Sequence, residues 1–447
     1  MNEDALGWFG ILRLGLVQSA LGAVVVIMTS TINRVMVVEL ALPAVVPGLL
    51  VALHYGVQIL RPAWGYGSDV GGRRTPWIIG GMAALALGGA GAAVATAWAA
   101  SQPVFGLALA ALSFLMVGVG VGAAGTSVLA LLATRVAPVR RAAAATTVWV
   151  MMIFGFAVTA PLAGRFLDPF SNLRLVAVAA TVSSVAFVVA FLAVLGVEGR
   201  QEKRNSPAIS TPRAAKPPFR EAFARVWEEP DARQFTIFIF VSMLAYSAQE
   251  LLIEPFAGIV FGMPPGATTQ LAGIQHSGAL IGMIAVAVVA SVIGGPVLGS
   301  LRLWTIGGCL ASALSLAFIA AAAALGPRYP LSAAVFALGA SNGVFAVAAI
   351  GSMMGLAGSG AHSREGIRMG LWGAAQALAF GLGGFLATAG VDVARIFVRS
   401  PEAYAIVFVV EALLFIAAAA LARGIRRGDA ERKRGASGAR DPVSVGA

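Results

Sequence analysis

Cysteine and charged residues are scarce in this chain. One of its 447 residues is a cysteine, Cys309, so no internal disulfide can form. Charged residues make up 11% of the sequence and hydrophobic residues 59%, and the mean hydropathy is +0.87. Apolar runs long enough for a spanning helix, which needs about 20 apolar residues, recur along the chain. The composition therefore excludes a soluble globular protein and predicts an integral membrane protein.

An alternating strand pattern and an export signal are also missing. The apolar runs are continuous, whereas the strands of a membrane barrel alternate between apolar and polar residues. The start MNEDALGWFG has no basic segment, and no small-residue cleavage site follows at a suitable distance. We therefore expect an all-α membrane protein whose first apolar run is retained as a span.

The breaks between apolar runs predict twelve membrane-spanning helices in two groups of six. They are expected at 11–42, 46–64, 76–98, 104–134, 142–165, 173–196, 233–261, 268–294, 301–325, 331–357, 366–390 and 403–423. The two halves cover 1–197 and 233–425. The charged, proline-rich stretch 198–232 is expected to be a linker between them, and 426–447 a basic tail.

The net charge of +11 follows the expected topology. Most lysines and arginines fall in loops on one side of the predicted bundle, and the positive-inside rule makes that side, with both termini and the linker, cytoplasmic. No basic stripe with interleaved aromatic residues occurs, so a nucleic-acid partner is not expected.

The loop between the second and third predicted helices, GYGSDVGGRR, carries a recognisable motif. It matches the pattern G-x3-D-x2-G-R-[KR] of major facilitator transporters at five positions, Gly65, Asp69, Gly72, Arg73 and Arg74. The glycines permit tight backbone geometry, and Asp69 can accept from a helix N-terminus or pair with an arginine. The alternative is a basic loop that only obeys the topology. With six helices on each side of a linker, the motif favours a major-facilitator-type bundle.

Four charged residues stand inside predicted spans. Arg34 and Glu39 in the first helix are five positions apart, about 140° around an α-helix, so we expect them to face different partners. Glu250 and Glu254 in the seventh helix are four positions apart and share a face. We predict that Arg34 pairs with Glu250 or Glu254 across the halves. The alternative is that Arg34 snorkels to the membrane surface.

Several stretches of the chain resemble the PucC/LhaA family of bacteriochlorophyll delivery proteins. They are TINRVMVVELALP (31–43), RRTPWI (73–78), LDPFSNLRL (167–175), QELLIEPFAGIVFGM (249–263) and REGIRMGLWGAAQALAFGLGG (364–384). The resemblance implies an assembly factor in the bacterial inner (intracytoplasmic) membrane. Such a factor binds bacteriochlorophyll as cargo and delivers it to light-harvesting or reaction-centre polypeptides, alongside bacteriochlorophyll synthase. The alternative is an alternating-access transporter of a small apolar or pigment-like molecule.

An enzymatic role is a third interpretation, which the acidic residues oppose. Attachment of a prenyl chain requires Mg²⁺ held on a diphosphate by clustered carboxylates. The seven aspartates are far apart in the sequence and no D-x-x-x-D pair occurs, so we expect neither catalysis nor a metal site.

For a pigment-binding family, the histidines are the natural candidate ligands. A neutral imidazole can ligate the central Mg²⁺ of a bacteriochlorophyll, and His54 and His276 lie in the second and eighth helices, which are repeat counterparts. Trp149 in the fifth helix could pack against a macrocycle. The alternatives are hydrogen-bonded structural histidines and ordinary aromatic packing.

Overall fold

The computed structural model describes residues 6–61, 64, 73–137, 140–198, 227–294, 298–358 and 365–424. Every regular element within these ranges is helical. The helices are α1 (Trp8–Val26), α2 (Val45–Val57), α4 (Thr75–Ala99), α5 (Pro103–Arg135), α6 (Arg141–Leu167), α7 (Asn172–Val194), α9 (Pro230–Phe261), α10 (Pro265–Val288), α11 (Leu301–Leu325), α12 (Leu331–Gly358), α13 (Glu365–Ala394) and α14 (Ser400–Gly424). Short π-helical or 3-10 turns extend α1, α2, α10 and α11.

The helices have the length and composition of membrane spans. In the described part of the chain, eleven are long and apolar enough to cross a membrane, with α1 and its π-helical end counted as one span, Trp8–Glu39. The remaining apolar helix, Val45–Leu60, is shorter. The predicted all-α architecture with twelve apolar helices is therefore confirmed, and 199–226, most of the predicted linker, lies outside the described residues.

Local sequence signals set several helix ends. Pro103, Pro230 and Pro265 each stand at the first position of a helix, where a missing backbone N–H costs no hydrogen bond. Ser171 accepts a hydrogen bond from the Arg174 amide and so caps α7. Gly262 ends α9 in the left-handed conformation, with φ of 64°.

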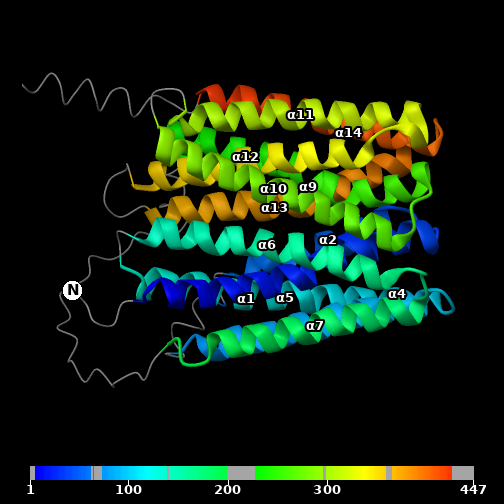
Figure 1. The fold of residues 1–447 in the computed structure, drawn as a ribbon, viewed down its shortest axis with the longest axis horizontal. Coiled ribbons are helices and arrows are strands. Elements are labelled where there is room, and N and C mark those ends of the chain that lie inside the picture. Colours follow the sequence, from blue (N-terminus) through cyan, green and yellow to red (C-terminus); the bar gives the residue numbers. More distant parts are fainter. Residues whose placement is uncertain are drawn as a thin grey trace, which may run out of the picture.

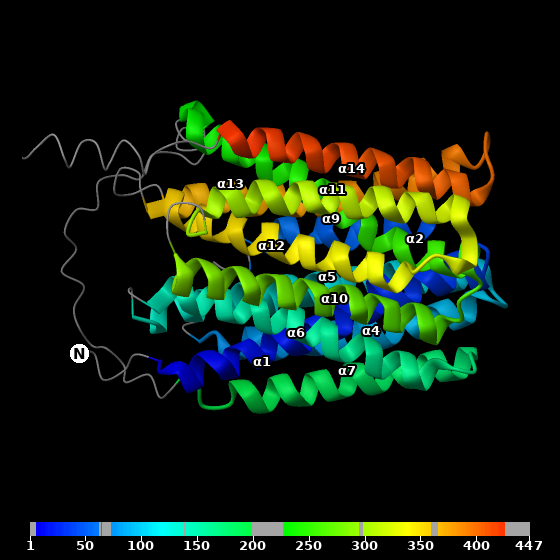
Figure 2. The same ribbon diagram turned by 45° about the horizontal axis from the view of Figure 1, so that its top comes forward.

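The helices form two bundles that lie side by side. Figure 1 shows α1, α4, α5 and α7 in one bundle and α9, α11, α12 and α14 in the other, with all helices running along the long axis. In Figure 2, α6 and α10 lie next to each other between the two bundles. One apolar core belongs to the first half and includes Leu251 and Ala272 from the second, while a separate core fills the second half.

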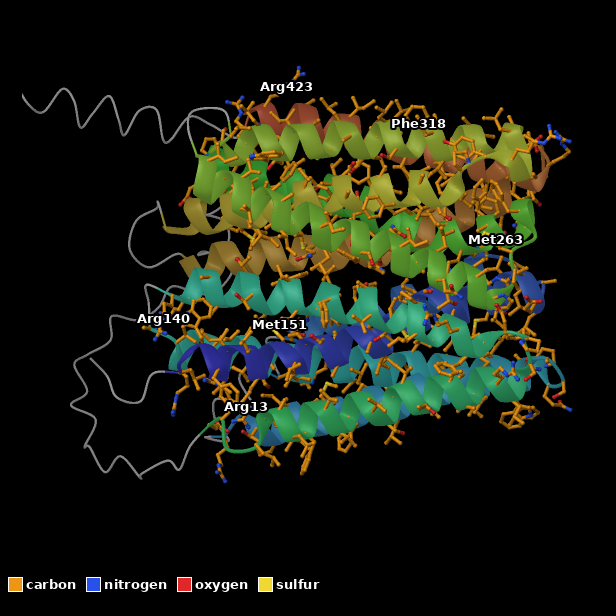
Figure 3. The ribbon with its side chains drawn as sticks, viewed as in Figure 1. Arg13, Arg140, Met151, Met263, Phe318 and Arg423 are labelled. Carbon is orange, nitrogen blue, oxygen red and sulfur yellow. The ribbon has the colours of Figure 1, made fainter. Side chains whose placement is uncertain are left out.

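The two ends of the bundle are named here after residues labelled in Figure 3. Arg13, Arg140 and Arg423 lie toward one end, the Arg140 end, and Met263 lies toward the other, the Met263 end. Helix α1 runs from the Arg140 end to the Met263 end. Between these ends it packs on α6, where Met151 covers Gly15 so closely that an added Cβ would lie 2.0 Å from the Met151 sulfur.

The last third of the first span is wound differently from the rest. Ile27–Ile32 and Val35–Glu39 are π-helical, and the Leu40 amide accordingly donates to the Val35 carbonyl, five positions back. A π-turn brings residues five apart to the same side of the helix. This winding determines where the charged residues of the first span point.

The seam between α6 and α10 is closed by small residues. A Cβ at Gly266 would lie 2.4 Å from the Gly164 carbonyl oxygen, and one at Gly273 would lie 2.3 Å from the Pro161 ring. Real Cβ atoms do not approach so closely, so only glycine allows the two backbones to meet here. The contact joins the fifth helix of the first half to the eighth helix of the chain.

Candidate functional site between the halves

Arg34 lies at the Met263 end of the first span and is buried, with 2% of its surface exposed. Its guanidinium forms an ion pair with Glu39 and donates to the Met263 carbonyl oxygen at 2.7 Å. It lies against Gly258 of α9, where a Cβ would be 3.0 Å from its Nη2. Arg34 therefore connects the first span to the loop that follows α9.

Two sequence predictions about Arg34 are wrong. Arg34 and Glu39 do share a side, because the backbone between them is π-helical and the 140° separation holds only for an α-helix. Among the described residues, the ion pair of Arg34 is with Glu39 and not with Glu250 or Glu254. Glu39 is close enough to pair locally, so no acid from α9 is needed.

Besides the contact of Arg34 with Met263, three uncharged side chains of the first span join it to the second half. Ser30 donates to Oε1 of Glu254, which is 2% exposed. Asn33 Nδ2 donates to the Leu251 carbonyl oxygen at 2.8 Å, and the Thr31 hydroxyl lies 3.0 Å from that of Thr269. The sequence analysis missed Ser30, Thr31 and Asn33. The signal was the stretch TSTINR (29–34), in which five of six positions are polar or charged inside an apolar run.

Glu250 lies one turn from Glu254 on α9, in an aromatic setting. The Tyr246 hydroxyl lies beside its carboxyl group, and Tyr55 of α2 is also nearby. The Tyr55 ring lies 5.2 Å from Phe380 of α13, and Phe380 lies 5.8 Å from Tyr246. These rings form a continuous path from α2, through α13, to the carboxyl group on α9.

The two candidate histidines lie in different places. His54 is buried on α2, where its Nε2 lies 3.0 Å from Gln58 Nε2 and its backbone carbonyl touches Gly118 of α5. Its Nδ1 has no hydrogen-bond partner among the described residues. His276 of α10 faces Phe156 of α6, with ring centroids 4.8 Å apart. Trp149 is half-buried on α6, seven positions before Phe156 and so on the same face.

Two aspartates join the halves in a symmetric manner at the Met263 end. Asp168, just after α6, accepts a hydrogen bond of 3.1 Å from the Gly266 amide at the start of α10. Asp392, near the end of α13, accepts one of 2.7 Å from the Val45 amide at the start of α2. Helices α6 and α13 are repeat counterparts, as are α2 and α10. Each contact sets a carboxylate against the positive end of a helix from the other half.

The loop motif at the Arg140 end is described only in part. Gly65, Asp69 and Gly72 lie outside the described residues, and Arg73 is exposed. Arg74 donates from Nη1 to the Ala130 carbonyl oxygen at 3.1 Å, which ties the motif to α5. The predicted role of Asp69 stays a prediction.

Glu198, the first residue of the predicted linker, is part of the folded first half. It accepts hydrogen bonds from the backbone amides of Arg74 and Thr75, at 2.7 and 2.9 Å, and one from the Thr75 hydroxyl. Partial burial works to raise the pKa of its carboxyl group, but these hydrogen bonds and the charge of Arg73 outweigh it and leave that pKa lowered. Glu198 thus caps the start of α4.

Buried polar side chains in the core of the second half were also missed. Glu411 of α14 and Gln249 of α9 are at most 1% exposed, and their polar atoms have no hydrogen-bond partner within the described ranges. Asn342 of α12 accepts from Ser312 of α11 at 2.8 Å. Across the described residues, no three His, Cys, Asp or Glu side chains lie together as metal ligands would.

Comparison with known proteins identifies the family. The family model described as PUCC protein matches residues 31–430. The chain belongs to the PucC family. It is 52% identical over 425 residues, 94% of this chain and 96% of the relative, to the "Bacteriochlorophyll synthase 44.5 kDa chain" of Rhodobacter capsulatus. It is 31% identical over 424 residues, 88% and 84% of the two chains, to "Protein PucC" of Cereibacter sphaeroides.

Solved structures identify the fold of this PucC-family chain. A crystal structure of the nucleoside transporter NupG, carrying the D323A substitution, superposes with a TM-score of 0.66 and covers 94% of this chain and 100% of its own, at 13% sequence identity. The identity is too low to indicate a shared substrate. The predicted major-facilitator-type bundle in two six-helix halves is confirmed.

Proposed function

We propose that this chain is a non-enzymatic assembly factor that binds bacteriochlorophyll as cargo and delivers it to light-harvesting or reaction-centre polypeptides. The observation that carries the proposal is the family match over residues 31–430, together with 52% identity to a relative named as a chain of bacteriochlorophyll synthase. A synthase partner explains that name without catalysis here. The site of action is the bacterial inner (intracytoplasmic) membrane, with both termini cytoplasmic.

The interior of the molecule supports a pigment as cargo. The path of Tyr55, Phe380 and Tyr246 provides aromatic faces, and two histidines provide imidazole nitrogens. His54 is the ligand nearer to this path, because its ring lies 4.7 Å from that of Tyr55, whereas His276 lies beside Phe156 on the α6–α10 seam.

Gentle purification from pigmented cells tests the proposal. We expect the full chain, extracted in mild detergent, to carry a bacteriochlorophyll absorption band and to copurify with synthase or antenna subunits. His54→Phe should shift or weaken that band, while His276→Phe serves as the matched variant at the counterpart position. A colourless preparation without such partners would contradict the proposal.

Transport is the second candidate, and one specific observation favours it. The fold is that of a nucleoside transporter, and polar side chains, Ser30, Glu254 and Glu250 among them, line the meeting point of the halves. Alternating access requires such a polar centre. Accumulation of pigment precursor inside liposomes that contain the purified chain, with none in empty liposomes, would favour transport over local delivery.

A further inference from the structure

The seam between α2 and α13 contains a lateral groove with a volume of about 220 Å³. Apart from Tyr55, every residue along it is apolar or glycine, including Leu49, Gly56, Leu378, Gly381 and Phe385. Leu49 is 58% exposed at its rim. In a membrane-spanning bundle, such a rim faces the lipid.

The counterpart seam is closely packed at several positions. Between α6 and α10, Gly164, Gly266, Gly273 and Pro161 bring the backbones into contact. The two seams are related by the repeat of the fold, so the close packing of α6 on α10 shows that this architecture does not by itself require a groove along α2 and α13.

The groove is closed toward the Met263 end. There Gly48 of α2 touches Thr388 of α13, where a Cβ would lie 2.0 Å from the Thr388 hydroxyl oxygen. One turn further on, Asp392 accepts the hydrogen bond from the Val45 amide. The groove is therefore closed at this end, and its exposed rim at Leu49 offers a sideways entrance.

The inner wall of the groove leads to polar groups. Tyr55 lines it, and the ring path through Phe380 and Tyr246 ends at the Glu250 carboxyl group. A molecule with an apolar chain in the groove would place a polar head near these rings. The groove is smaller than the roughly 300–1,000 Å³ of pockets that hold whole ligands, so it suits a slender part of one.

We propose that this groove binds the prenyl chain of an esterified pigment, with the macrocycle held outside it toward the Tyr55 ring path. The inference rests on the proposed function and names the part of the cargo that this seam recognises. The bilayer is as apolar as the groove, so selectivity must come from packing. Gly56 has open space where a Cβ would be, and Gly381 leaves a Cβ 3.4 Å from Tyr55, so both walls have notches for branch methyls. A straight acyl chain would leave these notches empty.

A substitution that fills the groove with a side chain tests the inference. Gly56→Leu places a side chain into the open space, and Gly307→Leu is the matched control, because Gly307 also has no atom within 4 Å of a Cβ and lies exposed on α11. The probes are bacteriochlorophyll a and its tail-free acid, bacteriochlorophyllide a, titrated into the full-length protein in nanodiscs of phosphatidylcholine.

We expect Gly56→Leu to weaken binding of the ester about tenfold and to leave binding of the free acid unchanged, since the groove contacts only the chain. Gly307→Leu should bind both as the unaltered protein does. Equal binding of the ester by Gly56→Leu and the unaltered protein would overturn the inference. So would an equal loss of both probes, because the groove would then hold the macrocycle, or displacement of the ester by excess phosphatidylcholine. Failure of the unaltered protein to bind either probe would instead refute the proposed function.

Discussion

Replacing Arg34 distinguishes two roles for this residue. Either it forms a buried ion pair, or its side chain only extends to the membrane surface. Its guanidinium pairs with Glu39 and at the same time donates a hydrogen bond to the Met263 carbonyl oxygen. A lysine ammonium cannot make both contacts with the same geometry. We expect Arg34→Lys to lower the free energy of unfolding by about 1.5–3 kcal/mol, the range for a lost hydrogen bond to a charged group. Thermal unfolding in detergent measures the change.

The control for this replacement lies at the same end of the molecule. Arg399 pairs with Glu402 but is 85% exposed, so Arg399→Lys should change stability little. Equal stability of Arg34→Lys and the unaltered protein would restore the alternative in which Arg34 snorkels to the membrane surface.

The sequence identified the charged residues of the first span and α9 as important, but it did not predict which residues they contact. A charged residue in an apolar run is costly wherever it points, so composition alone singled out Arg34 and Glu254. Their partners depend on the winding of the backbone between Ile27 and Glu39, and the residues there are as compatible with an α-helix as with a π-helix. Ser30 was overlooked because a hydroxyl in a membrane helix can also bond to its own backbone.

At the scale of helices, the two carboxylate contacts at the Met263 end connect four helices in counterpart pairs. Asp168→Asn and Asp392→Asn keep the shape of the side chain and remove its charge, so each should cost about 1–2 kcal/mol, the difference between charged and neutral hydrogen bonds. Together they should allow the Met263 ends of the halves to separate more often.

Distances between spin labels report this separation. Cys309 is fully buried, and Cys309→Ser supplies a background for labels at Ser101 and Arg328, which are exposed in loops of opposite halves at the Met263 end. We expect the double variant to gain a longer distance that Glu402→Gln, a charge removal within the second half, does not produce. An unchanged distribution in the double variant would show that these contacts do not hold the halves together.

Helix positions were the most predictable feature and helix ends the least. The twelve apolar runs fixed the spans, since only long apolar helices satisfy their backbone in lipid. Helix α13 runs to Ala394, past the expected end at 390, so it includes Asp392, which lies beyond the predicted span. The contacts of Asp168 and Asp392 were beyond prediction, since each partner is a backbone amide, which every sequence position offers.

For the whole molecule, the contacts between halves are extensive enough to replace a covalent link. The first span joins α9, the α6–α10 seam is closely packed, and Asp392 ties α13 to α2. We expect the chain expressed as two pieces, 1–210 and 211–447, to copurify in near-equal amounts through a tag on one piece.

Two glycine substitutions, one on the seam and one on the exposed surface, test whether the seam holds the pieces together. Gly273→Leu would press a side chain into the Pro161 ring across the seam, so the pieces should no longer copurify, whereas Gly307→Leu on the exposed face of α11 should have no effect. Independent elution of the unaltered pieces would contradict the expectation.

The π-helical end of the first span allows the number of residues in the span to change without a change in the direction of the helix. A π-turn holds one residue more than an α-helical turn, so losing one residue between Ile27 and Ile32 could return the segment to α-helix with little change in its reach across the bilayer. The side chains beyond that point would then keep nearly the same direction, whereas loss of one residue from an α-helical segment would turn them by about 100°. The segment is thus a place where a one-residue insertion or deletion during evolution changes the length of the chain and leaves the contacts of Arg34 in place.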